Sequence, residues 1–216
     1  MNLSLNYVKI KGTFYDELTD PKKVGRFRSW LHNARYQELS NSVKRYYRKG
    51  NVVLDLACGS CNWNSDKIPV IGVDINENLL NFGLKNGRLS KKIVADIYRI
   101  PLKSNFADIV IMSEILEHVS EIDKVLAESK RVLKIGGKLI TSVPYDSFPS
   151  PHLALFTIHC LIKGYIFGDP YYKKFCGHIN RFSMRKIRSI LANHFKIIEQ
   201  FPEHMLHIFT IAEKVT

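Results

Sequence analysis

The sequence has only four cysteines among its 216 residues, too few for a disulfide scaffold. Cys58 and Cys61 form a C-x-x-C pair, but no second pair and no closely spaced histidines accompany it. A zinc site would need such partners, and a redox site would need a thioredoxin-like context. Cys176 and His178 could complete a four-ligand set only if the fold brought distant segments together. We therefore expect no metal.

Other features are also missing. There is no internal repeat and no low-complexity linker. No N-terminal segment combines a basic start, an apolar run and a small-residue cleavage site, which predicts a cytoplasmic protein. The most apolar stretch, 151–167, is interrupted by His159 and Lys163 and is shorter than the about 20 apolar residues that span a bilayer.

What the chain has in excess is positive charge, +12 in total. Residues 1–50 hold 11 basic and 4 acidic residues, and residues 151–200 hold 8 and 2, so the two flanks carry the excess. Such flanks can attract RNA, an anionic membrane surface or an acidic small substrate. A solvated, lysine-rich surface explains scattered charge equally well, and the oligomeric state is left open.

Apolar runs alternate with helical patterns after residue 50, which predicts βαβ units and a mostly parallel, doubly wound Rossmann-like α/β sheet. The tail predicts a helix and then an antiparallel hairpin at one edge of the sheet. We expect strands at 51–57, 70–75, 92–95, 106–113 and 138–143, helices at 77–85, 121–133 and 184–194, and hairpin strands at 195–201 and 206–212.

Two segments lie outside this pattern. Residues 1–50 form a helical N-terminal extension in which Pro21 opens a helix toward Arg35, and residues 51–216 form the main domain. Residues 146–182 are a long insertion and a candidate substrate lid. Its apolar half predicts a lid helix, an interfacial helix on a membrane or a cap on the sheet. Its second half mixes tyrosines and lysines, which suits nucleic-acid bases or lipid headgroups.

Polar residues follow the predicted strands at their carboxyl ends, where ligands bind in open α/β sheets. Asp55 precedes a turn of small residues that contains Gly59, and Asp74 follows 19 residues later. An acidic side chain at the second position can accept the hydroxyls of a ribose. Asp96 ends the third strand, and Ser113 with Glu114 ends the fourth.

Four segments carry a family resemblance: VLDLACGS, GVDI, VADIYRIPLKSNFADIVIMSEILEHV and RVLKIGGKLITSVP, with a weaker echo in GHINRFS at 177–183. In order and spacing they resemble the class I S-adenosylmethionine-dependent methyltransferases of the type 11 group, which includes the ubiquinone and menaquinone biosynthesis methyltransferases. The resemblance covers about residues 50–145. It implies a transferase (EC 2.1.1.-) whose cofactor is S-adenosyl-L-methionine.

The resemblance also implies roles for individual residues. Asp55, Ala57 and Gly59 shape the pocket for the methionine part of the cofactor, and Ser113 offers its backbone there. Asp74 holds the ribose hydroxyls, and Asp96 accepts a hydrogen bond from the adenine amino group. Ile97 lies against the ring, with Ile75 nearby. The family usually has glycine where this chain has Ala57 and Cys61; because the cofactor has no phosphate, small side chains are expected to be tolerated. Only about two helical turns fit after Gly59.

Methyl transfer mainly requires alignment of an acceptor, helped by a base when the acceptor is a hydroxyl or an amine. His118, in the E-H-V motif, and His178 are the candidate bases, and Tyr145 is a candidate for orienting the substrate. The leading hypothesis is a methyltransferase for a small-molecule or lipid-linked acceptor. An RNA or tRNA methyltransferase and a non-catalytic S-adenosylmethionine-binding protein are the alternatives, and contact with nucleic acid or a membrane periphery stays open.

Overall fold

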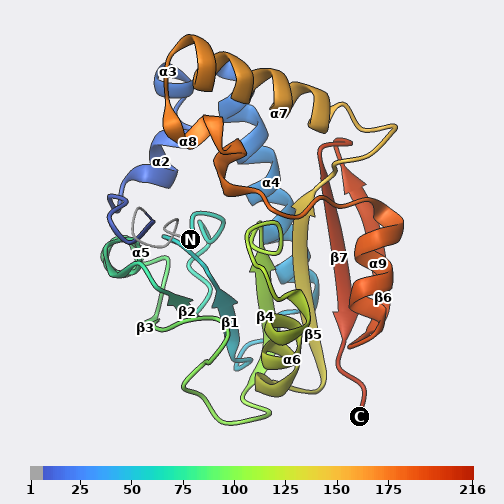
Figure 1. Cartoon of the computed structure of the whole chain (residues 1–216). Helices are drawn as coiled ribbons and strands as arrows, with labels where there is room; N and C mark the ends of the chain where they lie inside the picture. The colour runs from blue at the N-terminus through green and yellow to red at the C-terminus, as the bar shows by residue number, and fades with distance from the viewer. Residues whose placement is uncertain (1–6) are drawn as a thin grey trace.

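A seven-stranded sheet forms the centre of the structure, a computed structural model that describes residues 7–216 (Figure 1). The strand order is β3-β2-β1-β4-β5-β7-β6, and only β7 runs antiparallel to its neighbours. This arrangement confirms the predicted doubly wound sheet with its antiparallel C-terminal hairpin. The strands are β1 (Val53–Leu56), β2 (Val70–Asp74), β3 (Lys91–Val94), β4 (Ala107–Ser113), β5 (Leu133–Pro144), β6 (Lys196–Glu203) and β7 (His207–Glu213).

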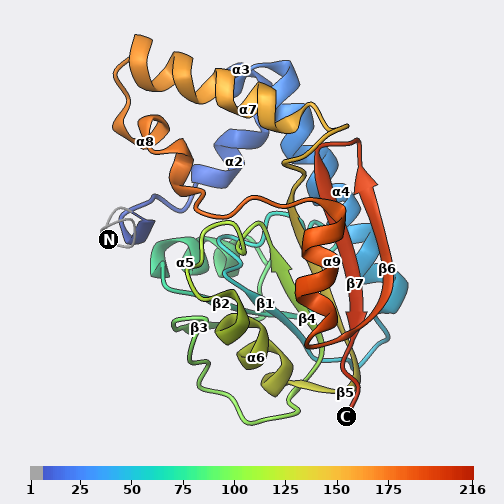
Figure 2. The ribbon, with the colours of Figure 1, turned by 45° about the vertical axis from the view of Figure 1, so that its right-hand side comes forward.

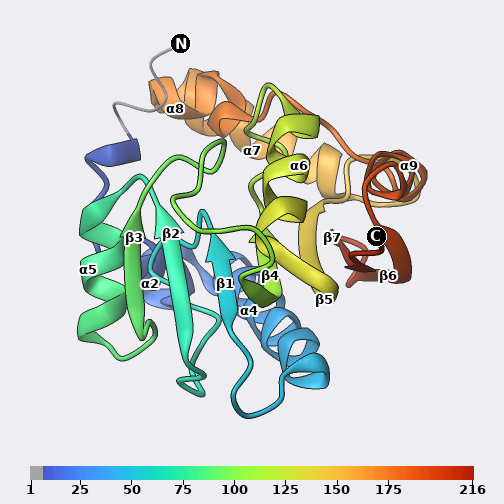
Figure 3. The same cartoon turned by 90° about the horizontal axis from the view of Figure 1, so that it is seen from below.

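Helices cover both faces of this sheet, as Figure 3 shows from below. Successive strand residues point to opposite faces, so Leu54 packs with α6 (Ile122–Val132) and α9 (Met184–Ala192). Val53 instead packs with α4 (Arg26–Tyr46) and α5 (Glu77–Lys85). Both faces are buried, which explains why the strands read as nearly continuous apolar runs.

The N-terminal segment contains α2 (Phe14–Thr19), α3 (Pro21–Val24) and α4. The prediction of one helix from Pro21 toward Arg35 is wrong in detail, because Gly25 has a φ of 83° and separates α3 from α4. Leu39 and Val43 of α4 are fully buried against the sheet. Residues 26–46 are therefore part of the same core as the strands.

The loop after β1 also differs from expectation, because residues 57–69 contain turns where two helical turns were predicted. Asn64 holds these turns: its side-chain amide donates to the carbonyls of Ile68 and Arg88, and its side-chain oxygen accepts from the Ile68 amide. The positive φ of Cys61, 52°, further excludes a regular helix here.

Residues 145–183 pass over the carboxyl ends of β4 and β5, at the top of Figures 1 and 2. They include α7 (His152–Leu161), a π-helical turn η1 (Ile162–Ile166), α8 (Pro170–Lys173) and a 3-10 turn η2 (Phe175–Gly177). The amides of Ile179 and Asn180 donate to the Glu117 carbonyl, which fastens the end of this segment to the loop after β4. Among the described residues, no helix has both the length and the apolar character needed to cross a bilayer.

Candidate active site

Asp55 lies under the loop that follows β1, with 2% of its surface exposed. Its carboxylate accepts hydrogen bonds from Trp63 Nε1 at 2.8 Å and from Cys61 Sγ at 3.5 Å. Burial raises the pKa of Asp55 to about 7. Asp55 thus fixes the loop through the side chains of Trp63 and Cys61, and its role in shaping the methionine pocket stays a prediction.

Three residues of this loop, Ala57, Gly59 and Cys61, have φ angles of 54°, 54° and 52°. This left-handed conformation favours glycine. Gly59 also has no space for a side chain, since a Cβ atom there would lie 2.6 Å from the Tyr15 ring. Ala57 and Cys61, the two departures from the family pattern, keep the glycine-like backbone despite their side chains.

Asp74 ends β2 and is 1% exposed. Its carboxylate accepts from the amides of Gly59 and Asn76, both at 2.8 Å, and from the Tyr7 hydroxyl at 3.0 Å. Burial raises its pKa, although these hydrogen bonds oppose the shift. Asp74 therefore joins the glycine loop to β2 and already accepts one hydroxyl group.

The other expected cofactor residues follow at neighbouring strand ends. Asp96, after β3, is exposed and accepts from the Tyr98 amide at 3.0 Å. Ile75 is 37% exposed and Ile97 is 8% exposed. Ser113 ends β4, where its hydroxyl lies 2.8 Å from that of Ser142. Since β3, β2, β1 and β4 are adjacent, the sheet brings all these positions to one edge.

His118 and His178 come together at the end of β4, with ring centroids 4.8 Å apart. His118 Nδ1 lies 3.3 Å from the Gly177 carbonyl. A carbonyl can only accept, so Nδ1 carries the proton and Nε2 is left as an acceptor. Burial lowers the pKa of His118, and burial with the neighbouring His118 lowers that of His178 to about 4. Both imidazoles are neutral at pH 7.

Glu117 lies beside this pair and is 1% exposed. Its Oε1 is 3.8 Å from His118 Nε2, and its Oε2 has no hydrogen-bond partner within residues 7–216. Burial, reinforced by repulsion from Glu114, raises the pKa of Glu117 well above its ordinary value. A buried carboxyl group with a raised pKa thus lies next to two neutral imidazoles, a group suited to proton transfer.

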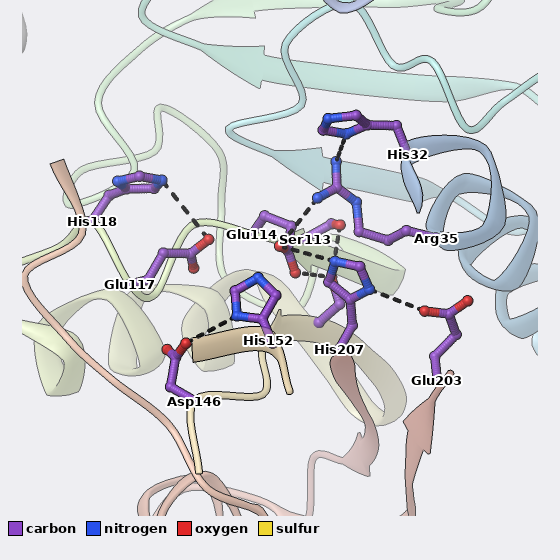
Figure 4. A network of polar contacts seen from close by, with 11 residues as sticks. His32, Arg35, Ser113, Glu114, Glu117, His118, Asp146, His152, Glu203 and His207 are labelled. Atoms are coloured by element: carbon purple, nitrogen blue, oxygen red, sulfur yellow. Dashed lines mark hydrogen bonds and ion pairs between the residues drawn. The ribbon is translucent and has the colours of Figure 1, made fainter. Parts of the chain in front are cut away.

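A second polar network borders this group, as Figure 4 shows. Glu114 accepts from Arg35 at 3.1 Å and from the Ser142 hydroxyl at 3.0 Å, and its Oε2 lies 3.8 Å from His207 Nε2. Burial raises the pKa of Glu114, but the Arg35 guanidinium and His207 outweigh burial and bring it down to about 2. Glu114 is therefore ionised at neutral pH, whereas the pKa of Glu117, three residues later, is shifted in the opposite direction.

Sequence reasoning did not identify most of this network. Arg35 comes from α4 and His207 from β7, and nothing in their local sequence marks them as neighbours of Glu114. His152, at the start of α7, is 3.1 Å from Asp146 Oδ1, and His207 Nδ1 is 3.0 Å from Glu203. The one signal in the sequence for this network is the position of Glu114, which directly follows Ser113 at the end of a predicted strand.

Tyr145 is 7% exposed and packs in the apolar core formed with α6 and α9. Its role in orienting a substrate stays a prediction.

The possible four-ligand metal site of Cys58, Cys61, Cys176 and His178 does not form in the part of the chain described. There, the one group of three or more metal-binding side chains is Glu117, His118 and His178, whose ligand atoms lie within 4.8 Å of one another.

Comparison with known proteins shows which family the central part of this chain resembles. Residues 54–141 match the model of the methyltransferase domain family. An uncharacterized protein of Methanocaldococcus jannaschii is 36% identical over 142 residues, which cover 64% of this chain and 54% of that protein. The ubiquinone/menaquinone biosynthesis C-methyltransferase UbiE of Burkholderia cenocepacia is 28% identical over 149 residues, 61% of this chain and 58% of that protein. Within residues 54–141 this chain is similar to the class I S-adenosylmethionine-dependent methyltransferases.

Solved structures agree on the fold. An S-adenosylmethionine-dependent methyltransferase of Aquifex aeolicus superposes with a TM-score of 0.63 at 18% identity, covering 96% of this chain and all of that one. The cofactor named in the description of that protein is S-adenosylmethionine. The chain spans little more than half the length of the two curated relatives.

The strand-end residues suit this cofactor chemically. A buried carboxylate that accepts the Tyr7 hydroxyl can accept a ribose hydroxyl in the same way. Asp96 is open to accept an amino group, and the exposed Ile75 offers an apolar side chain for an adenine ring, whereas Ile97 is buried in the core. The glycine-like backbone at Ala57, Gly59 and Cys61 keeps the loop compact. Tyr7 and Tyr15 cover Asp74 and Gly59 from the N-terminal segment.

Proposed function

We propose that this protein transfers the methyl group of S-adenosylmethionine to a small or lipid-linked acceptor, with His118 or His178 as the base. The observation that carries this proposal is the pair of neutral imidazoles at the end of β4, beside the strand ends that suit the cofactor. His118 Nε2 is held as a proton acceptor, and a base of this kind is useful when the acceptor is a hydroxyl or an amine.

When bound, the cofactor supplies a methyl group that is already activated on a sulfonium. Asp74 and the loop around Gly59 would hold the cofactor, and the proton that the acceptor hydroxyl or amine loses on methylation would pass to an imidazole nitrogen of His118 or His178. The residues of this chain align the acceptor and take that proton. The raised pKa of Glu117, next to His118, disfavours a negative charge there that would stabilise the cationic imidazole.

The segment above the histidines supports an acceptor with an apolar part. Phe156 of α7 stacks on His178, and Phe175 of η2 lies 6.4 Å from Phe156 between ring centroids. We propose that residues 146–182 act as the acceptor lid, next to the main domain of residues 51–216 and the extension of residues 1–50. The name of the UbiE relative, which refers to quinone biosynthesis, points in the same direction. A cytoplasmic location also belongs to this proposal.

Incubation of the protein with methyl-labelled S-adenosylmethionine and a total cell extract tests the proposal. The label should appear in the lipid or small-molecule fraction, together with S-adenosylhomocysteine. Wild type should be compared with His118→Gln and His178→Gln, which keep hydrogen-bonding capacity but remove the base. We expect at least one of them to bind cofactor normally and to lose about 10²–10⁴-fold in turnover.

Two other outcomes of this experiment would point to a different function. Label in the RNA fraction, with retention on RNA that falls steeply with salt, would mean that the basic flanks select a nucleic acid. Cofactor binding without S-adenosylhomocysteine in any fraction would mean a non-catalytic binding protein. Either result would overturn the proposal for the acceptor.

A further inference from the structure

The outer face of α7 and η1 presents a row of exposed apolar side chains. The residues of this α7 patch are Leu155, Ile158, Leu161, Ile162, Ile166 and Phe167. Leu155, Ile158, Ile162 and Ile166 recur every three or four residues, which places them along one side of a continuous helical segment, and Leu161 and Phe167 adjoin them in sequence. Ile166 is 75% exposed and Phe167 is 69% exposed. In Figures 1 and 2 this segment lies at the top of the molecule, at its outer edge.

The opposite side of the same segment faces the protein. Cys160 and Gly164 are buried, and a Cβ atom at Gly164 would lie 2.8 Å from the Lys173 amide nitrogen. Phe156, on the inner side, stacks on the His178 imidazole. The segment therefore has one face committed to the candidate active site and one apolar face that no described residue covers. Large contiguous apolar patches on a protein surface typically mark interaction sites.

The charge around the α7 patch indicates what it binds. No aspartate or glutamate occurs between Asp146 and Asp169. Lysines border the patch: Lys163 Nζ lies 5.0 Å from the centre of the Phe167 ring, and Lys173 Nζ lies 5.8 Å from that of Tyr165. Apolar side chains with lysines and a tyrosine at the rim suit a bilayer surface, where the rings enter the headgroup layer and the ammonium groups meet lipid phosphates.

We infer that the α7 patch docks this protein onto an anionic lipid bilayer, with α7 lying in the interface. The inference deepens the proposed function, because it places the membrane on one side of α7 and the candidate bases on the other. Membrane binding itself needs neither cofactor nor turnover. An acceptor anchored in the bilayer would then have to pass the edge of α7 to reach His178.

Vesicle flotation of the full chain without cofactor tests this inference. The probes are vesicles of pure phosphatidylcholine and vesicles of equal parts phosphatidylcholine and phosphatidylglycerol. We expect binding to the anionic vesicles, weakened by salt. Ile158→Ser with Ile166→Ser should weaken it at least about tenfold, because both side chains lose their apolar contact with lipid. Ile135→Ser, at a 62% exposed isoleucine of β5, is the matched control and should bind like wild type.

A second variant measures how deeply the α7 patch enters the bilayer. In Phe167→Trp, the added tryptophan should be quenched by brominated lipid beyond the background of Trp30 and Trp63 in wild type. Absence of binding to both vesicle types, or equal loss in the Ile135 control, would overturn the inference. So would a dimer or a captured protein partner that depends on Ile158 and Ile166 while vesicles are ignored. If vesicles bind but S-adenosylmethionine does not, the proposed function fails and the docking inference stands.

Discussion

The Phe156 ring stacks on the imidazole of His178, with ring centroids 4.7 Å apart and an angle of 18° between the planes. Phe156 helps to bury His178, and burial is the largest cause of its low pKa. Phe156→Ala should therefore raise the pKa of His178 from about 4 toward its ordinary value of 6.5. Because a base works only while unprotonated, the acid limb of the pH–rate profile should move up in pH.

The measurement is turnover against pH for wild type and Phe156→Ala. Phe27→Ala, at an exposed phenylalanine of α4, serves as the control and should leave the profile in place. An unchanged acid limb in Phe156→Ala, with turnover intact, would show that His178 is not the base.

The Tyr7 hydroxyl occupies an acceptor position of the Asp74 carboxylate that the cofactor ribose is expected to use. Tyr7→Phe should remove this competition and tighten S-adenosylmethionine binding, by up to about tenfold for a hydrogen bond to a charged group. Calorimetry of Tyr7→Phe beside Tyr47→Phe, at the end of α4, measures the effect. Weaker binding in Tyr7→Phe would mean that Tyr7 contributes to cofactor binding.

The ion pair of Arg35 and Glu114 should make stability depend on pH in the acid range. The pKa of Glu114 falls from 4.5 to about 2 on folding, so its ionised form adds stability above pH 4.5. That contribution, roughly 3 kcal/mol, should disappear as the pH falls from 4.5 toward 2. Urea unfolding at several pH values in this range gives the free energy of unfolding at each pH. This free energy should change less with pH in the double variant Arg35→Met with Glu114→Gln than in wild type. The same dependence of the free energy of unfolding on pH in both proteins would contradict the pairing of Arg35 with Glu114.

No metal is expected to be needed, although Glu117, His118 and His178 place their ligand atoms within 4.8 Å of one another. Turnover should survive treatment with a chelator, and elemental analysis of the washed protein should find no stoichiometric zinc. The environment of the C-x-x-C pair supports this, because Cys61 is buried beside Asp55 and burial raises the pKa of both thiols. Loss of activity that added metal restores would contradict the prediction.

Much of the fold could be predicted from local sequence. The strand 70–75 and the helix 77–85 match β2 and α5 almost to the residue, because apolar runs and the Asn76 cap mark their limits. Asp74 and Asp96 could be placed at the same edge because parallel strands share their carboxyl ends.

Contacts between distant segments could not be predicted in this way. Arg35 meets Glu114 across 79 positions of sequence, and Tyr7 meets Asp74 across 67. The loop after Gly59 was predicted as a short helix because residue spacing alone does not show that Asn64 bonds to Ile68 and Arg88. His118 and His178 were both selected from their motifs, but their proximity depends on the hydrogen bonds of Ile179 and Asn180 to Glu117.

The most direct test of the central claim is calorimetric titration of S-adenosylmethionine into wild type, Asp74→Ala and Asp74→Asn. Asp66→Ala, at a carboxylate 46% exposed and paired with Lys44, is the control, and thermal melts check that each variant folds. We expect wild type and Asp66→Ala to bind alike. Asp74→Ala should bind at least about tenfold more weakly, because a charge-assisted hydrogen bond to the ribose is lost, with Asp74→Asn between them. No binding by folded wild type, or an unchanged dissociation constant in folded Asp74→Ala, would contradict the account.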